Sequence, residues 1–396
     1  MNHTDEKEKR MTTRFAVLLA VVAGLAVGNL YWAQPLLADI AADFGVSADR
    51  GGLLVTATQL GYALGILFIV PLGDMMSKRT ILLGVTSLAI VFLALCAAVP
   101  SLWYLGAALI GMGICTVSGQ IIVPLAGDLA EANTRGRIVG IVASGITIGI
   151  LCSRLLSGVV ADIWGWRSVY VVAVACNLAG LGMIWLRVPH GTARASISYG
   201  RLIQSVMTAL RRHPAVAAIL IKQGLIFGIC FNLFWTAMTF VLAEVFQYTP
   251  LQIGLFSMAG LAGAAAGARF GGLQDGGYGD AAMGVFIALT AVCMTAAAFC
   301  GQTVAGLAGI AVVFSIAVQG VGVLCQARLF MLSDTERSRL NTVYVVSNFM
   351  FSALGSFLAA YAWREGGWEL VAAFAAGASV LALAEWIYEM MKKEHI

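Results

Sequence analysis

The sequence predicts an all-α polytopic membrane protein, with 12 transmembrane helices arranged as two pseudo-symmetric six-helix bundles. Three observations predict this fold class: an apolar composition, apolar segments that recur along the chain, and an internal repeat. Of the 396 residues, 60% are hydrophobic and 11% are charged, whereas a soluble domain is about 45–50% apolar and about 25% charged. The composition therefore excludes a soluble enzyme, a disordered chain and a nucleic-acid-binding protein.

Each expected helix is an apolar segment close to the length of about 20 residues that crosses a bilayer. The apolar runs are continuous and do not alternate, which excludes a transmembrane barrel. The first run is too long for the apolar core of a signal peptide, so we expect it to remain as the first helix. The 12 expected spans cover roughly residues 15–37, 51–72, 80–99, 103–127, 138–160, 167–187, 215–243, 251–272, 281–300, 303–327, 340–362 and 369–391.

Charges in the connecting loops predict the orientation. The loops on one side carry 19 lysines and arginines, and the loops on the other side carry three, Arg50, Arg167 and Arg364. Lysine and arginine concentrate in cytoplasmic loops. We therefore expect a multi-pass protein of the plasma membrane with both termini in the cytoplasm.

The longest loop divides the spans six and six. Apolar side chains recur on one face of this loop between arginines, which is typical of a helix lying on the membrane surface, with a plain linker as the alternative. The expected organisation is a cytoplasmic tail over 1–14, a six-helix bundle over 15–187, a cytoplasmic linker over 188–214, a second bundle over 215–391 and a tail over 392–396.

The two halves repeat each other at a nearly constant offset. Asn29–Trp32 matches Asn232–Trp235 with an offset of 203 residues. A parallel repeat of six spans is typical of transporters built from two pseudo-symmetric halves. Further matches, all with an offset of 202, are Gly52 with Gly254, Gly61 with Gly263, Gly65 with Gly267, Arg135 with Arg337, and Gly165–Trp166 with Gly367–Trp368.

Three loop motifs carry a resemblance to a known family. After the second span, Gly73–Asp74 is followed by the basic pair Lys78–Arg79, and the second half keeps a related Gly271–Asp275. The other two motifs are Arg135-Gly-Arg137 after the fourth span and Gly165-Trp166-Arg167 after the fifth. With these motifs the chain resembles the major facilitator superfamily over essentially its whole length. The resemblance implies a gating role for Asp74, Lys78, Arg79 and Asp275.

A further resemblance concerns the branch of the family. The segments Tyr31–Leu37, Gln59–Tyr62 and Pro71–Asp74 are similar to bacterial efflux members near the 12-span drug:proton antiporters, which implies the bacterial inner membrane. The chain departs from those members in the fourth span, where Ala107 stands in place of their intramembrane arginine. It also departs in the fifth span, where Arg154 occupies a stretch that is rich in glycine and proline in the family.

Arg154 is the most informative single residue. It lies within the fifth span, where an arginine costs at least about 2.5–3.5 kcal/mol on insertion scales, so it should face a cavity or a partner. One interpretation is a fixed cation that binds an anionic or polar part of a substrate. The alternative is a structural residue bonded to backbone carbonyls. Arginine stays charged, so Arg154 does not shuttle protons.

Other polar residues inside the spans are candidates for a substrate cavity. The family resemblance implies that the first and seventh helices line such a cavity, and amide and indole groups suit an amphipathic ligand. Helix packing is the alternative role. The candidate cavity residues are Asn29, Tyr31, Trp32, Gln34, Gln59, Tyr62, Gln120, Arg154, Asn232, Trp235, Gln319, Tyr344 and Asn348.

Titratable groups are sparse inside the spans. No Asp, Glu or His lies near the middle of a span, and the candidates for proton coupling lie at the rims: Asp39, Asp128 and Glu244. Lys222 lies about eight residues into the seventh span, and we expect its stem to reach the cytoplasmic surface. A cavity with an arginine and no central carboxylate favours a neutral or anionic solute over a cationic one.

The expected function is secondary active transport, with export of a small organic solute in exchange for protons by alternating access. An uptake permease or uniporter is the alternative, and a non-transporting membrane sensor is the alternative from another class. No nucleophile–base set, metal cluster or phosphate-binding loop occurs, so we expect no enzyme activity, no cofactor and no metal. The expected partners are the solute, protons and the lipid bilayer, without nucleic acid, and the expected state is a monomer.

Overall fold

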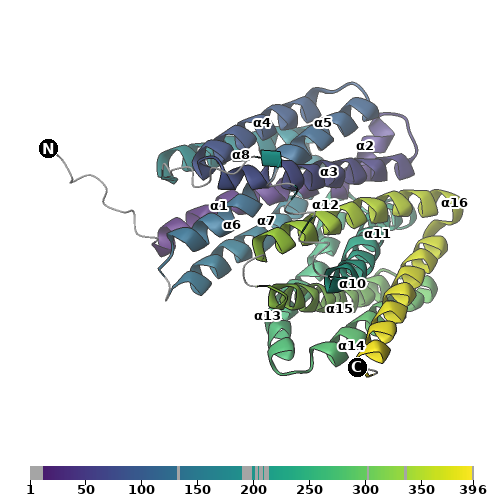
Figure 1. Ribbon diagram of the computed structural model, residues 1–396. Coiled ribbons are helices and arrows are strands. Elements are labelled where there is room, and N and C mark those ends of the chain that lie inside the picture. Colours follow the sequence, from purple (N-terminus) through teal and green to yellow (C-terminus); the bar gives the residue numbers. More distant parts are fainter. Residues whose placement is uncertain are drawn as a thin grey trace.

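The computed structural model describes residues 12–131, 134–189, 199–200, 204, 208, 214–300, 303–333 and 337–394. All regular structure in this part of the chain is helical. The tail expected over residues 1–14 and the surface helix expected in the linker fall mostly outside these residues. In Figure 1 the N-terminal half, coloured purple to blue, lies above the C-terminal half, coloured green to yellow.

The helices of the N-terminal half follow the expected spans. The first crossing breaks into short turns around Pro35, because proline has no amide hydrogen to donate. The elements are α1 (Thr13–Gly28), η1 (Asn29–Tyr31), η2 (Gln34–Leu36), α2 (Leu37–Asp43), α3 (Ala48–Phe68), η3 (Val70–Asp74), α4 (Lys78–Ala98), α5 (Leu102–Cys115), α6 (Ser118–Leu129), α7 (Arg135–Trp164) and α8 (Trp166–Arg187).

The C-terminal half repeats this order. Thr249 begins one of its helices with a capping box, in which the Thr249 hydroxyl accepts from the amide of Gln252 and the Gln252 side chain accepts from the amide of Thr249. The elements are α10 (Pro214–Gln223), the π-helical η4 (Gly224–Cys230), α11 (Phe231–Phe240), the π-helical η5 (Val241–Val245), α12 (Pro250–Phe256), η6 (Ser257–Gly260), α13 (Leu261–Asp275), α14 (Gly279–Cys300), α15 (Val304–Met331) and α16 (Arg337–Glu394).

The number of crossings agrees with the 12-span expectation. Over the described residues, 11 helical stretches are long and apolar enough to cross a membrane, and the longest is Arg339–Lys392. That stretch contains a break at Gly366 and Gly367, so it holds two crossings. Gly367 has a φ of 59° and its repeat partner Gly165 has a φ of 80°, a region of backbone conformation that glycine enters without steric cost.

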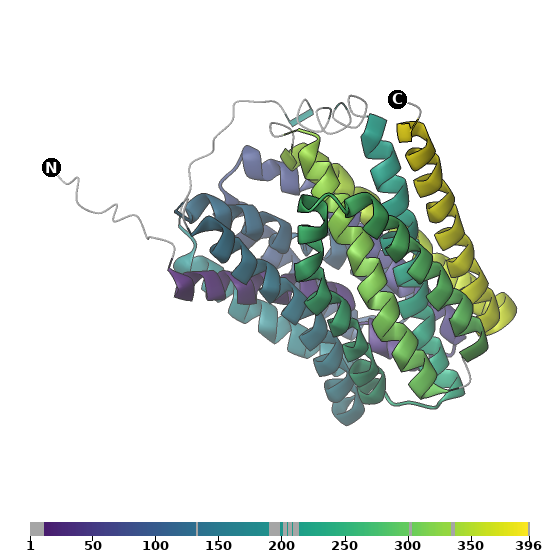
Figure 2. The same ribbon diagram turned by 90° about the horizontal axis from the view of Figure 1, so that it is seen from below.

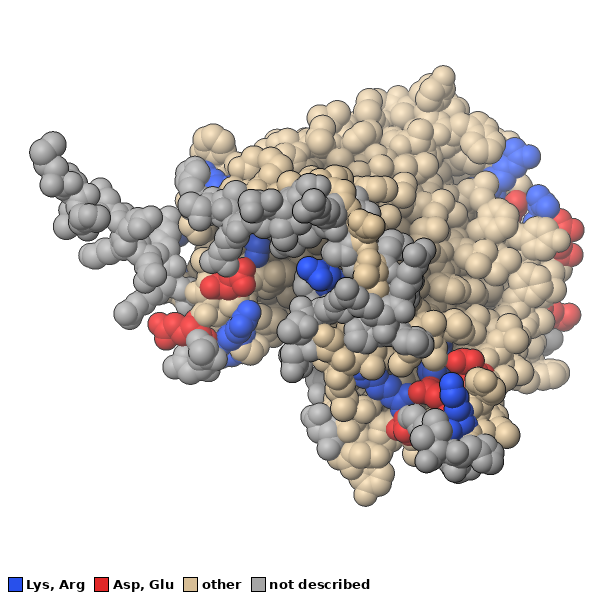
Figure 3. Space-filling model, in the orientation of Figure 1, with Lys and Arg blue, Asp and Glu red and all other residues tan. Residues whose placement is uncertain are grey.

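Apolar side chains on the outer surface identify the faces that meet lipid. On α14, Val285, Val292 and Phe299 are exposed at intervals of seven residues, which places them on one face of the helix. On the face that Figure 3 shows, uncharged residues cover most of the surface and charged side chains gather in a few clusters. The fold therefore presents an apolar belt to the bilayer.

The two halves meet along two helix pairs that the repeat relates, α3 with the first part of α16 and α7 with α12. Gly52 of α3 lies against Ala360 of α16, and its repeat partner Gly254 lies against the backbone of Arg154 in α7. A Cβ atom on Gly254 would come within 2.9 Å of the Arg154 carbonyl oxygen. Small residues at these points let the two halves approach closely.

The contact between α7 and the C-terminal half lies near one side of the molecule. We call the side where α1 begins and α16 ends the terminal face, and the other side the opposite face. Near the opposite face the Thr249 hydroxyl donates to Asp162 (2.9 Å) across the two halves. Toward the terminal face, α7 and α13 do not pack along each other over their described lengths. In Figure 2, α1 and the last part of α16 diverge strongly in direction.

Candidate functional site

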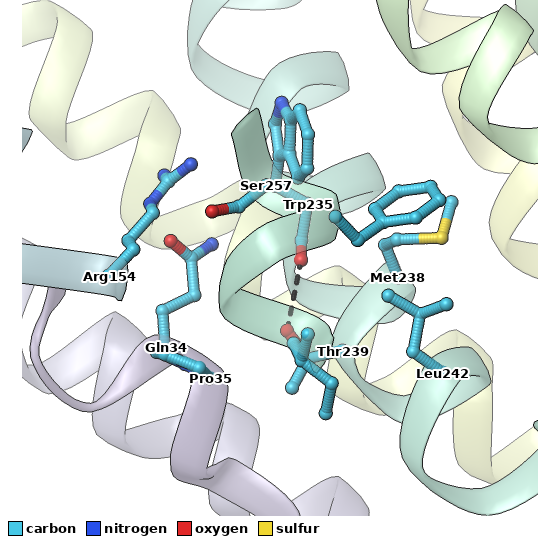
Figure 4. Close-up of a pocket in the computed structure, with 10 residues that line it drawn as sticks. Gln34, Pro35, Arg154, Trp235, Met238, Thr239, Leu242 and Ser257 are labelled. Carbon is cyan, nitrogen blue, oxygen red and sulfur yellow. Dashed lines mark hydrogen bonds between the residues drawn. The ribbon is translucent and has the colours of Figure 1, made fainter. Parts of the chain in front are cut away.

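A small pocket lies between the two halves. Its N-terminal-half wall comes from η2 and α7, and its C-terminal-half wall comes from α11, η5, α12 and η6. The cavity measures about 20 Å³, which is room for about one water molecule. Figure 4 shows the side chains that line it: Gln34, Pro35, Arg154, Trp235, Met238, Thr239, Leu242, Ile253, Phe256 and Ser257.

Arg154 supplies the charge of this pocket. Its side chain is 4% exposed, and its guanidinium carbon lies 4.8 Å from the ring centre of Tyr31 and 5.5 Å from that of Trp235. No described residue forms an ion pair or a hydrogen bond with the side chain of Arg154, and its buried Nε has no hydrogen-bond partner. Burying a cation without a counter-charge costs free energy. The two aromatic faces attract the Arg154 guanidinium, but they leave most of its hydrogen-bond donors unused.

Two further polar groups of the same pocket lack partners. The Oε1 atom of Gln34 and the Nε1 atom of Trp235 are buried without a hydrogen bond. The hydroxyl of Ser257 donates to the Gly254 carbonyl (2.6 Å) and keeps its capacity to accept. The pocket thus offers donors from Arg154 and Trp235 and an acceptor from Gln34. Such a set suits a polar ligand that carries both kinds of group.

The local folds explain how these side chains meet. Gln34 precedes Pro35 in the broken part of the first crossing, where the chain leaves the regular helix. Arg154 reaches the pocket because α7 approaches α12 closely at Gly254, and one turn later at Gly158, where a Cβ would lie 2.5 Å from the Pro250 carbonyl oxygen. Figure 4 shows Arg154 and Gln34 on one side of the pocket, with Trp235 and Ser257 across from them.

Some of the candidate cavity residues bond within the N-terminal half. The Nδ2 atom of Asn29 donates to Thr116 and to Asn177 (both 3.1 Å), and the Trp32 indole donates to the Asn29 carbonyl (3.0 Å). A second such bond joins the amide of Gln120 to the hydroxyl of Tyr62 (3.2 Å). The structure does not bring these side chains into the pocket.

Another group of candidates joins the two halves. The Gln59 amide donates to the Asn232 carbonyl (2.5 Å), and the Ser356 hydroxyl donates to the Gln59 carbonyl (3.0 Å). Ser356 also lies 3.3 Å from the hydroxyl of Thr236, which donates to it. This buried network connects α3 with α11 and α16 next to the pocket.

The remaining candidates bond within the C-terminal half. Asn348 accepts from the side chain of Gln223 (2.5 Å), and the Tyr344 hydroxyl donates to the Gly322 carbonyl (3.0 Å). The side chain of Gln319 packs against Gly267. None of these three candidates lines the pocket.

The candidate gating residues lie at the terminal face. Lys78 pairs with Asp128 (2.8 Å), and Arg135 lies 3.9 Å from the same carboxylate. Arg79 donates to the Trp185 carbonyl (2.6 Å) and lies over the Trp185 ring. The side chains of the other two candidates, Asp74 and Asp275, fall outside the described part of the chain.

The candidate proton-coupling residues lie away from the pocket. Asp128 takes part in the ion pair with Lys78, and Asp39 is exposed near the opposite face. Glu244 is also exposed and accepts from the indole of Trp363 (3.0 Å). None of the three lines the pocket.

Lys222 corrects one expectation. Its side chain has no exposed surface and pairs with Glu389 of α16 (2.6 Å), so the expectation that it reaches the surface is wrong. Arg328 of α15 lies 3.7 Å from the same carboxylate and pairs with Asp280 of α14. A charge buried in a membrane protein is stabilised by a nearby opposite charge. The hydropathy pattern did not show this partner, because Glu389 lies 167 residues further along the chain.

The sequence reasoning missed most of the apolar lining. Met238, Thr239 and Leu242 follow Trp235 by three, four and seven residues, which is the spacing of one helix face. That spacing was available as a signal once Trp235 was a candidate. Ile253, Phe256 and Ser257 had no such signal, because they enter the pocket only through the contact of α12 with the N-terminal half.

Comparison with known proteins agrees with this architecture. The family model described as "Major Facilitator Superfamily" matches residues 17–330. The "Uncharacterized transporter YgaY" of Escherichia coli O157:H7 is 36% identical over 373 residues, which cover 93% of this chain and 94% of that protein. The "Probable transporter SCO4007" of Streptomyces coelicolor is 31% identical over 370 residues, covering 93% of this chain and 85% of that protein. The solved structure of the nucleoside transporter NupG matches with a TM-score of 0.78 at 13% identity, covering 94% of this chain and 99% of NupG.

Proposed function

The chain belongs to the Major Facilitator Superfamily of transporters, and we propose that it moves a small neutral or anionic organic solute by alternating access around the Arg154 pocket. Like its relatives, it is a transporter and not an enzyme. The observation that carries the proposal is the buried, unpaired guanidinium of Arg154 between the two halves, next to the unsatisfied groups of Gln34 and Trp235.

The chemistry of the pocket supports the class of solute. A carboxylate or another anionic oxygen group would satisfy the Arg154 guanidinium and accept from the Trp235 indole, and such charge-assisted bonds are the stronger kind. A hydroxyl or amide on the same solute would donate to Gln34. Met238, Leu242 and Phe256 supply apolar contact for its carbon skeleton. A cation would meet the uncompensated charge of Arg154 and would be repelled.

The size of the pocket supports a conformational cycle. At about 20 Å³ it is far smaller than the usual range of about 300–1,000 Å³ for ligand sites. A solute therefore enters only if α7 and α12, or the elements around Trp235, move apart. Rocking of one half against the other about this site produces that movement.

We further propose that the solute is exported in exchange for protons across the bacterial inner membrane, with both termini in the cytoplasm. The resemblance of Tyr31–Leu37 to efflux members supports export, and the basic loops of the terminal face support the orientation. Arg154 binds the solute and does not carry the proton. Asp39, Asp128 and Glu244 remain the proposed proton-coupling candidates, and the terminal-face residues Asp74, Lys78, Arg79 and Asp275 remain the proposed gating residues.

The test is transport in proteoliposomes and everted vesicles with benzoate, glucose and tetraphenylphosphonium as anionic, neutral and cationic probes. We expect benzoate or glucose to dissipate an imposed pH gradient, and Arg154→Ala to abolish this flux. An affinity loss of at least about tenfold is expected, because a hydrogen bond to a charged group contributes about 1.5–3 kcal/mol.

Arg137→Ala is the matched control, because Arg137 is an exposed arginine on the same helix. It should transport like the wild type. Full transport by Arg154→Ala, or dissipation by the cation alone, would contradict the proposed site. Flux that ignores the pH gradient would favour uniport over proton exchange.

A further inference from the structure

A second, larger cavity lies at the opposite face and has no part in the proposed transport site. It measures about 450 Å³, within the usual size range of ligand sites. Phe44 lines it from the end of α2, and Asp49 and Arg50 line it from the start of α3. Trp103 lines it from the start of α5, and Tyr361 and Arg364 line it from α16. The cavity therefore bridges the two halves of the protein.

The charge of this cavity centres on Arg50. Arg50 is exposed, and no described residue forms an ion pair or a hydrogen bond with its side chain. Arg364 is bonded by Glu365 (2.9 and 2.7 Å), and Asp49 lines the same cavity. The Arg364 charge is therefore compensated within the protein. The Arg50 guanidinium is left to attract an anionic group from outside.

The surroundings of Arg50 indicate where that anion comes from. Trp103 is 74% exposed and the next residue, Tyr104, is 65% exposed. Tryptophan and tyrosine concentrate at the level of the lipid headgroups, where one part of the ring meets hydrocarbon and the other meets water. On the preceding helix, Val91 and Leu95 are exposed at a spacing of four residues and continue the apolar surface toward the membrane interior. These residues give a lipid acyl chain an apolar surface to pack against beside the cavity.

We propose that this cavity binds a membrane phospholipid with an anionic headgroup, whose phosphate pairs with Arg50 and whose chains follow the exposed surface of α4 and α5. Ala360 also lines the cavity and is the residue against which Gly52 packs. The bound lipid thus contacts α3 and α16 at the place where these helices join the two halves. Binding of this kind stabilises the conformation that is closed at the opposite face, because the site is complete only there.

The experiment measures lipid-dependent thermal stability of the purified full-length protein in detergent. Phosphatidylglycerol should raise the Tm of the wild type in a saturable manner, and phosphatidylcholine should raise it much less. In Arg50→Gln we expect the apparent affinity for phosphatidylglycerol to fall about tenfold, as for loss of one charge-assisted hydrogen bond. Trp103→Ala should weaken the same response by removing the apolar wall.

The matched control is Arg137→Gln, which removes the same charge from an exposed position at the terminal face and should respond like the wild type. An unchanged phosphatidylglycerol affinity in Arg50→Gln would overturn the proposal. An equal Tm shift with inorganic phosphate would also overturn it, because the site would then bind free phosphate rather than lipid. The measurement needs no transported solute, so its result is independent of the proposed transport function.

Discussion

At the scale of single residues, buried polar groups without a hydrogen-bond partner indicate the candidate site better than polar residues as a class do. Asn29 and Asn232 occupy matched positions of the repeat, and the side-chain amides of both are hydrogen-bonded, Asn29 by side chains and Asn232 by the Gln59 side chain and the Gly228 carbonyl. Their neighbours Trp32 and Trp235 are also matched, yet only the Trp235 indole is left without an acceptor. A buried donor without a partner costs about 1–3 kcal/mol. A bound solute that accepts this bond recovers that cost.

Trp235→Phe tests the role of this indole, since it keeps an aromatic ring beside Arg154 and removes the donor. We expect solute affinity to fall about two- to tenfold, as for one neutral hydrogen bond of about 0.5–1.5 kcal/mol. Affinity is measured by solute titration of purified protein. Trp368→Phe serves for comparison, because the Trp368 indole donates to the Ala297 carbonyl (2.7 Å) away from the pocket. Unchanged affinity in Trp235→Phe would mean that the indole does not contact the solute.

At the scale of elements, the ion pair between Lys222 and Glu389 holds the C-terminal end of α10 against α16. Lys222 is fully buried and Glu389 is 26% exposed. The π-helical segment Gly224–Cys230 follows directly, before α11 brings Trp235 to the pocket. Such π-helical turns are frequent at functional sites. The ion pair thus holds the base of the helix that carries one wall of the pocket.

Lys222→Met is expected to reduce the free energy of unfolding by about 1–3 kcal/mol, because it leaves the partly exposed Glu389 carboxylate without its nearest partner. The double variant Lys222→Met/Glu389→Leu should recover most of this loss, since well-packed apolar residues often replace a buried ion pair without cost. Thermal unfolding in detergent measures both. Lys78→Met breaks a more exposed pair, with side chains 23% and 38% exposed, and should cost at most about 1 kcal/mol. A double variant as unstable as the single one would show that the charges themselves are needed.

At the scale of the whole molecule, two kinds of contact join the halves. Gly158 of α7 packs against α12, and the Gln59 network links α3 with α11 and α16. The first contact depends on close backbone approach and the second on buried hydrogen bonds. Gly158 lies one turn nearer the opposite face than Arg154, whereas Asn232 of the network precedes Trp235 on α11 and lies on the terminal-face side of the pocket. Opening the pocket toward that face has to separate α7 from α12, so the Gly158 contact biases the conformational equilibrium.

Gly158→Leu is expected to shift the molecule away from this closed conformation, because a Cβ there would lie 2.5 Å from the Pro250 carbonyl oxygen. Spin labels at Ser47 and Gln247, both exposed at the opposite face in different halves, report the shift as a longer and broader distance distribution. Gly140→Leu provides the comparison, since Gly140 lies on the same helix with open space beside it. An unchanged distribution in Gly158→Leu would mean that this contact does not control closure.

Much of the fold follows from local properties of the sequence. Hydropathy and loop charge predicted 12 crossings in two halves, and the repeat predicted which positions are equivalent. The structure gives matched roles to Gly52 and Gly254, which both face the other half, and to Gly165 and Gly367, which both break a helix. These features were predictable because length, apolar content and repeat spacing act within one segment or between aligned segments.

The partners of individual polar groups were decided only by the tertiary structure. Arg154 was recognisable as an intramembrane cation, but its lack of a counter-charge depends on every helix around it. Lys222 looked similar in sequence and nevertheless has Glu389 as a partner. Hydropathy predicts that a charged residue is buried, but it does not predict which side chains that residue contacts. Which buried charge is paired and which is left without a counter-charge is fixed by side chains that the fold brings together from distant parts of the chain.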